Sequence, residues 1–197
     1  MRSLIVYLML LLTTPAAAHQ PLKIDSGKLV SITGRINNLT GESQRLLLLS
    51  NQDSAPITIV IDSNGGSVIA GLEFYRAMDR VKSRGVKLRC VVVGHAMSMA
   101  MHILGNCSTR YALPTSLLMW HPAYVSGYMK LDEDKAKRYG DQLRLLTRYL
   151  ERRLRKALRL RRSVYHKHYK GEYIMLAADL KRLTPKFLTV ISDVRSN

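Results

Sequence analysis

The chain has 197 residues, of which 47% are hydrophobic and 23% charged, and its formal net charge at pH 7 is +17. This composition is typical of a globular protein and excludes a disordered one, and the length suits one domain with a sizeable core. The sequence contains no internal repeat and no low-complexity tract.

The first eighteen residues differ from the rest. A single cation, Arg2, precedes an apolar run over 4–12, and Ala16 and Ala18 form the small-residue pattern of a signal-peptide cleavage site. The run is shorter than the ~20 apolar residues that span a bilayer. We therefore expect residues 1–18 to be a signal peptide and the mature domain, 19–197, to be exported, periplasmic or secreted. A retained, membrane-associated segment is the alternative.

Strands alternate with helices along the remaining chain, which favours an α/β layered fold. The helix that follows the second strand has Ser67 as a candidate N-cap and Gly85 as a stop signal. Expected strands are 28–36, 57–66, 86–94, two within 109–121, and 187–194; expected helices are 42–52, 68–84, 94–107, about 132–162, and 175–183.

Two cysteines, Cys90 and Cys107, are the only ones in the chain. In an oxidising compartment they can form a disulfide, and two buried thiols are an equal alternative. The sequence leaves this choice open.

Two strand-to-helix junctions place chemically useful groups together. Gly65-Gly66 ends one buried strand, and Ser98-Met99 lies near the end of the next. Ligands bind outside the carboxyl ends of parallel strands, where uncovered backbone N–H groups and a helix N-terminus favour an oxyanion. Taken singly, a serine here is more often a helix cap and a Gly-Gly pair a turn.

A serine needs a base to act as a nucleophile. Among the six histidines, His121 ends an apolar, strand-like run, "SLLMWHPAY", whereas His95 is close enough to Ser98 to shape or cap its turn. The order of Gly-Gly, serine and histidine carries more weight than any one of them.

With these three segments in this order, the sequence resembles the proteolytic subunit of the Clp protease, ClpP. "ITIVIDSNGGSVIAGLEFYRAM" is similar to the family's strand, Ser-Pro-Gly-Gly and helix; "CVVVGHAMSMAM" to its Gly-x-Ala-x-Ser-Met-Gly segment; and "RYALPTSLLMWHPAY" to its histidine segment. The resemblance covers most of residues 30–124 and continues weakly to about 194. It implies a ClpP/crotonase-like fold of repeated β-β-α units with a long protruding helix.

The resemblance also implies roles for particular residues. It makes Ser98 the nucleophile, His121 the general base, and the backbone N–H groups of Gly66 (beside Gly65) and Met99 the oxyanion donors. The best match to the family's acidic segment, "EYIMLAADL", places Glu172 third in the triad, with Asp179 at a later acidic position.

The chain departs from the family pattern at four places. Asn64 replaces the proline before the glycines, Ala100 replaces the glycine after Ser-Met, and a glutamate replaces the triad aspartate. The glycine-rich substrate-binding strand is hard to find in "AYVSGYMKLDEDK". The signal peptide peptidases share the layout but pair serine with lysine, and the histidine motif favours the Clp-type assignment.

We therefore expect an exported, ATP-independent, homo-oligomeric serine endopeptidase that acts on peptides or unfolded proteins. No cofactor, metal or nucleic acid is expected. The alternative is a catalytically inactive ClpP-like protein that serves in assembly or membrane-surface binding.

The positive charge is concentrated in residues 135–170, which contain fourteen lysines and arginines and two acidic residues. Leucines at 143, 146, 150, 154 and 158 recur at helical spacing and form one apolar stripe. The simplest interpretation is a solvated helix that packs this stripe on the domain or a neighbouring subunit. Contact with an anionic membrane surface or an acidic partner is the functional alternative.

Overall fold

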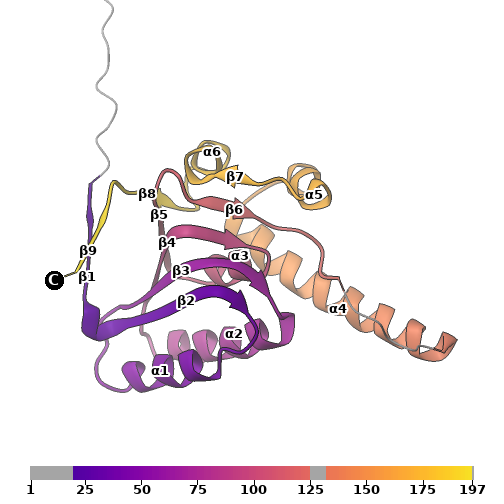
Figure 1. Cartoon of the computed structure of the whole chain (residues 1–197), viewed down its shortest axis with the longest axis horizontal. Coiled ribbons are helices and arrows are strands. Elements are labelled where there is room, and N and C mark those ends of the chain that lie inside the picture. The colour runs from indigo at the N-terminus through magenta and orange to yellow at the C-terminus, as the bar shows by residue number, and fades with distance from the viewer. Residues whose placement is uncertain (1–19, 125–131, 197) are drawn as a thin grey trace, which may run out of the picture.

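The structure is a computed structural model that describes residues 20–124 and 132–196 (Figure 1). The expected signal peptide lies outside the described residues. So do residues 125–131, which are most of the segment where the family has its glycine-rich strand. The expectations for these two segments stay predictions.

The described chain alternates strands and helices as the sequence indicates. Its strands are β1 (Leu22–Ile24), β2 (Leu29–Ile36), β3 (Ile57–Gly66), β4 (Leu88–Met97), β5 (Thr109–Ala112), β6 (Leu117–Met119), β7 (Met175–Leu176), β8 (Thr189–Val190) and β9 (Val194–Ser196). Its α-helices are α1 (Thr40–Ser50), α2 (Val68–Ser83), α3 (Met99–Gly105), α4 (Glu133–Leu158), α5 (Arg162–Gly171) and α6 (Ala177–Leu183), and a 3-10 turn spans Ser26–Lys28.

The central sheet is mostly parallel, with strand order β2-β3-β4-β5-β8. The first half of β4 pairs with β5, and its last three residues, His95–Met97, pair in parallel with β6. The short β7 is antiparallel to β6. This confirms the α/β fold class, and it brings the carboxyl ends of β3, β4 and β6 to one edge.

Helices α1, α2 and α3 pack against the sheet, and α4 packs on α3. α1 and α2 pack side by side along a face of the sheet, and α3 is buried along its whole length between the sheet and α4 (Figure 1). α4 packs through Leu150, Leu154 and Leu158, whereas its N-terminal half is largely exposed and projects from the body. The predicted apolar stripe therefore anchors only the second half of the helix.

Three predicted boundaries were wrong. The helix expected over 94–107 begins only at Met99, because Gly94–Met97 continues β4 and pairs with β3 and β6. The helix expected to 162 ends at Leu158, whose carbonyl accepts a hydrogen bond from the Thr184 hydroxyl, and Arg159 then adopts a left-handed conformation. The last strand is divided into β8 and β9, the latter pairing with the unpredicted β1.

Cys90 and Cys107 form a disulfide, so the choice that the sequence left open is decided in favour of the bridge. It joins β4 to the end of α3 across a sequence separation of 17 residues, and both cysteines are buried. Closing a loop of this size stabilises a fold by about 3 kcal/mol. The bridge therefore fixes the C-terminal end of α3, the helix that begins directly after Ser98.

Candidate active site

Ser98 occupies the turn between β4 and α3. Its φ of 52° lies in the positive region that side chains other than glycine rarely adopt, and its N–H donates to the Met119 carbonyl at 3.0 Å. The hydroxyl makes no capping hydrogen bond to α3. No hydrogen bond therefore supports the interpretation of this serine as a helix cap.

His121 follows β6 and faces the Ser98 hydroxyl. Because Met97 pairs with Met119 in the β4–β6 ladder, the residues just beyond the two strands reach the same edge of the sheet. His121 Nε2 lies 2.8 Å from Ser98 Oγ, and the imidazole side chain is only 8% exposed. This distance is within the range for proton transfer from a hydroxyl to a general base.

Glu172 lies on the other side of the imidazole. It ends α5 in a left-handed conformation (φ 49°), and its Oε1 is 3.5 Å from His121 Nδ1. That separation is an ion-pair contact rather than a hydrogen bond, and the buried Nδ1 has no hydrogen-bond partner among the described residues. Since the Glu172 side chain is 60% exposed, water screens its charge from the ring.

The geometry predicts a small effect for Glu172→Gln. We expect kcat/KM on a peptide ester to fall about 10-fold, because an exposed carboxylate at this distance contributes on the order of 1 kcal/mol. A buried triad acid contributes about 10⁴-fold. Asp179→Asn is the matched control, since Asp179 instead pairs with Arg182; a loss above a thousandfold for Glu172→Gln would contradict the screened contact.

Gly65 and Gly66 fill positions that admit no side chain. Both have positive φ, 86° and 145°, and a Cβ on Gly65 would lie 2.6 Å from both the Met97 carbonyl and Ser98 Cβ. The same atom would lie 2.9 Å from the Met99 backbone nitrogen. The turn after β3 therefore packs directly on the turn that carries Ser98, so the predicted oxyanion donors and nucleophile share one edge.

A groove of about 850 Å³ runs past these residues. Both glycines, Ser98, His121 and Glu172 line it, and α4 supplies part of its far wall with apolar and aromatic side chains. The lining from α4 consists of Tyr139, Gln142, Leu143 and Leu146. A volume of this size is typical of ligand-binding clefts, and the Ser98 side chain lies at the wall of this one.

Two other histidines in the described residues pair with carboxylates. His95 lies on β4 and its Nδ1 is 2.9 Å from Asp62 Oδ1, so this contact links β4 to β3. The imidazole of His166 pairs with Glu151 at 3.0 Å. His121 is therefore the histidine that the fold presents to Ser98.

His102 is a residue of the site region that sequence reasoning missed. It lies one helical turn after Ser98, and the two side chains line a small apolar pocket together with Val68 and Pro122. Burial, and secondarily the proximity of His121, lowers the pKa of His102 to about 4, so the ring is neutral at neutral pH. The i, i+4 spacing from Ser98 is the signal that could have revealed it.

A family comparison agrees with this geometry. The family model described as Clp protease matches residues 19–183. The chain belongs to the Clp protease family. This confirms the resemblance that the Gly-Gly, serine and histidine segments indicated, and it covers α4 and α5 as well.

Curated relatives of the Clp family match at moderate identity. The chain is 41% identical over 88 residues to the ATP-dependent Clp protease proteolytic subunit 2 of Thermobifida fusca, which is 43% of this chain and 40% of the relative. It is 33% identical over 99 residues to the chloroplastic subunit 3 of Arabidopsis thaliana, covering 48% and 31%. The chain thus spans about two fifths or less of the length of these relatives.

Two departures from the Clp family pattern have different settings. Ala100 is fully buried in α3, whereas Asn64 is exposed and lines the groove beside Gly65. Asn64 is therefore the departure that a bound ligand would touch.

Within residues 20–124 and 132–196, no group of three or more histidine, cysteine or acidic side chains could hold a metal ion. Among the helices described, none is long and apolar enough to cross a membrane.

Proposed function

We propose that this chain is a serine endopeptidase that hydrolyses peptide bonds through an acyl-enzyme. Ser98 Oγ attacks the scissile carbonyl carbon while His121 Nε2 accepts the hydroxyl proton. The tetrahedral intermediate collapses when the imidazolium returns that proton to the leaving amine. Water then attacks the ester with His121 again as base, which releases the acid product and restores the serine hydroxyl.

The negative charge on the carbonyl oxygen requires donors placed in advance. The backbone N–H groups of Gly66 and Met99 are the proposed donors, and Met99 is also the first residue of α3, where the helix favours negative charge. Glu172 favours the imidazolium that forms transiently at His121. In this mechanism Glu172 acts on the ring orientation and charge and does not itself take the proton.

The single observation that carries the proposal is the 2.8 Å contact between Ser98 Oγ and His121 Nε2. Two further features of Ser98 support the proposal: its positive φ and the absence of a capping hydrogen bond from its hydroxyl to α3. A positive φ at a residue other than glycine is strained, and such strain is often found at active sites. Membership of the Clp protease family supports the same reaction class.

The test is covalent labelling with a fluorophosphonate probe. We expect the folded wild type to gain the probe mass on the peptide that contains Ser98, and Ser98→Ala to gain none while unfolding at the same denaturant concentration. A well-folded wild type that resists the probe would overturn the proposal and favour the catalytically inactive alternative.

The wider context of the activity is also a proposal. The substrates are peptides or unfolded proteins, the protein acts as a homo-oligomer, and residues 1–18 direct it to the periplasm or outside the cell. The relatives are named ATP-dependent. Export would separate this chain from cytosolic ATP, so the proposed activity is ATP-independent.

The alternative is an inactive protein that uses its basic helix for assembly or for contact with an anionic membrane surface. One observation favours a binding role for this helix: Arg148, Arg152 and Lys156 on α4, and Arg159 directly after it, are exposed. Their setting is a cleft rather than a flat face.

A further inference from the structure

A second large cavity lies on a different part of the molecule from the groove at Ser98. It is a cleft of about 1070 Å³ between the second half of α4 and the segment that joins α3 to β5. Four cations line it from α4, namely Arg148, Arg152, Arg153 and Lys156, and Arg159 lines it from the position directly after the helix. Three more, Lys82, Arg110 and Lys186, line it from α2, β5 and the loop after α6. We call these eight cations and the space between them the basic cleft.

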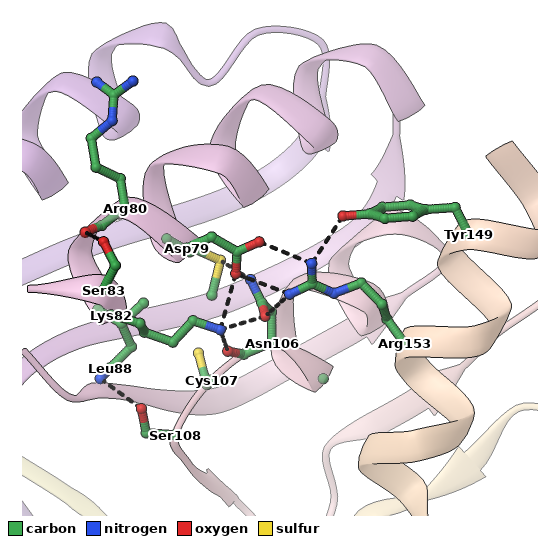
Figure 2. Close-up of polar contacts among 12 residues, drawn as sticks. Asp79, Arg80, Lys82, Ser83, Leu88, Asn106, Cys107, Ser108, Tyr149 and Arg153 are labelled. Carbon is green, nitrogen blue, oxygen red and sulfur yellow. Dashed lines mark hydrogen bonds and ion pairs between the residues drawn. The ribbon is translucent and has the colours of Figure 1, made fainter. Parts of the chain in front are cut away.

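One carboxylate organises the cations at the inner end of the basic cleft (Figure 2). Both Asp79 oxygens accept hydrogen bonds from the Arg153 guanidinium at 2.9 Å, and Lys82 Nζ is 3.1 Å from Asp79 Oδ1. The Asn106 amide oxygen accepts from Arg153 at 2.9 Å and from Lys82 at 2.6 Å. The two cations are therefore fixed in place before any ligand arrives.

Arg110 is held without any carboxylate. Its guanidinium donates to the carbonyls of Leu104, Gly105, Cys107 and Phe187, at 2.7 to 3.2 Å. Its pKa is lowered by burial and also by repulsion from Arg159. Burial likewise lowers the pKa of Lys82, and repulsion from Arg153 and Arg110 adds to that effect.

The basic cleft therefore has a large charge imbalance. None of its lining residues is acidic, and Asp79 is the one carboxylate that contacts its cations among the described ion pairs. Like charges at this density cost free energy unless an anion enters. Because arginine binds carboxylates with two parallel N–H donors, the fixed and exposed guanidinium groups suit several carboxylates at once.

The shape and the lining select among anionic ligands. Arg148 lies on α4, and Arg159 follows its last residue eleven positions further along the chain. At the rise of a helix this corresponds to roughly 16 Å, or about five residues of extended chain. Leu145, Tyr149 and Ala157 lie between or beside the cations and offer apolar contacts that simple anions would not use. A flat bilayer surface reaches the exposed rim but not Lys82 and Arg153, whose side chains are only 28% and 33% exposed.

The aromatic rings argue against single-stranded nucleic acid. Binding of unpaired bases relies on open aromatic faces. Here Arg153 lies over the ring of Tyr75 at 4.6 Å and of Tyr149 at 5.6 Å. We propose that the basic cleft binds an extended acidic polypeptide segment of a partner protein, with its carboxylates on the arginines of α4.

The experiment measures binding of a fluorescein-labelled peptide that alternates glutamate and leucine to the full chain carrying Ser98→Ala, which prevents cleavage. We expect binding that weakens steeply with added salt, and a dissociation constant raised about 10-fold or more by the double variant Arg148→Glu, Arg152→Glu. Both side chains are exposed and lie outside the Asp79 network, so the fold is not at risk.

The matched control is Lys137→Glu, Arg138→Glu, an equal charge change on exposed positions of α4 outside the cleft. It should leave the dissociation constant within about twofold, apart from the weak long-range effect of net charge. Equal loss in both double variants, or equal binding of a glutamine-for-glutamate peptide, would overturn the proposal. So would tighter, cleft-dependent binding of phosphatidylglycerol vesicles or of an oligonucleotide, or cleft-dependent self-association without peptide.

Discussion

Replacing His121 by alanine should reduce kcat/KM for a peptide substrate by about 10³-fold or more, because the variant removes the proposed general base for the Ser98 hydroxyl. The wild-type contact is already 2.8 Å, so no rearrangement is needed to form the reactive pair. The loss should appear in kcat, with KM little changed, since the imidazole acts on the transition state. Steady-state assays on the same substrate measure kcat and KM, and a denaturation curve for each protein shows that both are folded.

His95→Ala is the matched control for this prediction. His95 is also close to Ser98 in sequence, but its imidazole bonds to Asp62 at 2.9 Å. We expect kcat/KM of this variant to stay within a few-fold of wild type. Equal losses in the two variants would assign the effect to disturbance of β4 rather than to a base, and an unaffected His121→Ala would remove His121 from the mechanism.

The site could be anticipated from sequence where its parts follow strands. Ser98 and His121 come one and two residues after strands whose apolar runs are visible in the chain, and the carboxyl ends of parallel strands lie at one edge. The contact of Glu172 is less predictable, because it depends on where α5 ends and on a left-handed residue at that end. His102 was missed because a histidine in an apolar helix resembles ordinary core until its neighbours are known.

The fold was predictable in its elements and less so in their limits. The sequence of Gly94–Met97 resembles the start of a helix, yet this segment pairs with β3 and β6 as part of β4. Its pairing partners are more than twenty positions away in the sequence. The division between α4 and α5 likewise depends on a distant hydroxyl, that of Thr184. Local periodicity does not contain either contact, whereas the helix limits at Ser67 and Gly85 are local and were correct.

The basic cleft illustrates the same limit for charge. The sequence shows that residues 135–170 are strongly basic, and an amphipathic helix in solvent explains the pattern equally well. What converts part of that charge into a concave site is the opposite wall, where Lys82 and Arg110 come from α2 and β5. Those two residues are distant in sequence and carry no motif.

Gly65→Ala should impair both stability and activity, because this glycine is the contact between the two halves of the site. A left-handed φ of 86° costs an alanine about 1–2 kcal/mol, and overlap with the Met97 carbonyl and Ser98 Cβ at 2.6 Å adds about 1–3 kcal/mol. Relief of that overlap must displace Ser98 or the Met99 N–H. A displacement near 1 Å at reacting groups costs about 100-fold in rate.

Gly85→Ala separates the backbone effect from the contact. Gly85 has nearly the same φ, 85°, but an added Cβ there meets nothing within 4 Å. We expect this control to lose only the backbone cost of about 1–2 kcal/mol in urea denaturation and to keep wild-type kcat/KM. If Gly65→Ala matched Gly85→Ala in both measurements, the packing of the Gly65 turn on the Ser98 turn would have no part in catalysis. If instead Gly65→Ala alone loses activity while remaining folded, the strained serine and the glycine turn act as one unit, which neither residue reveals when considered separately.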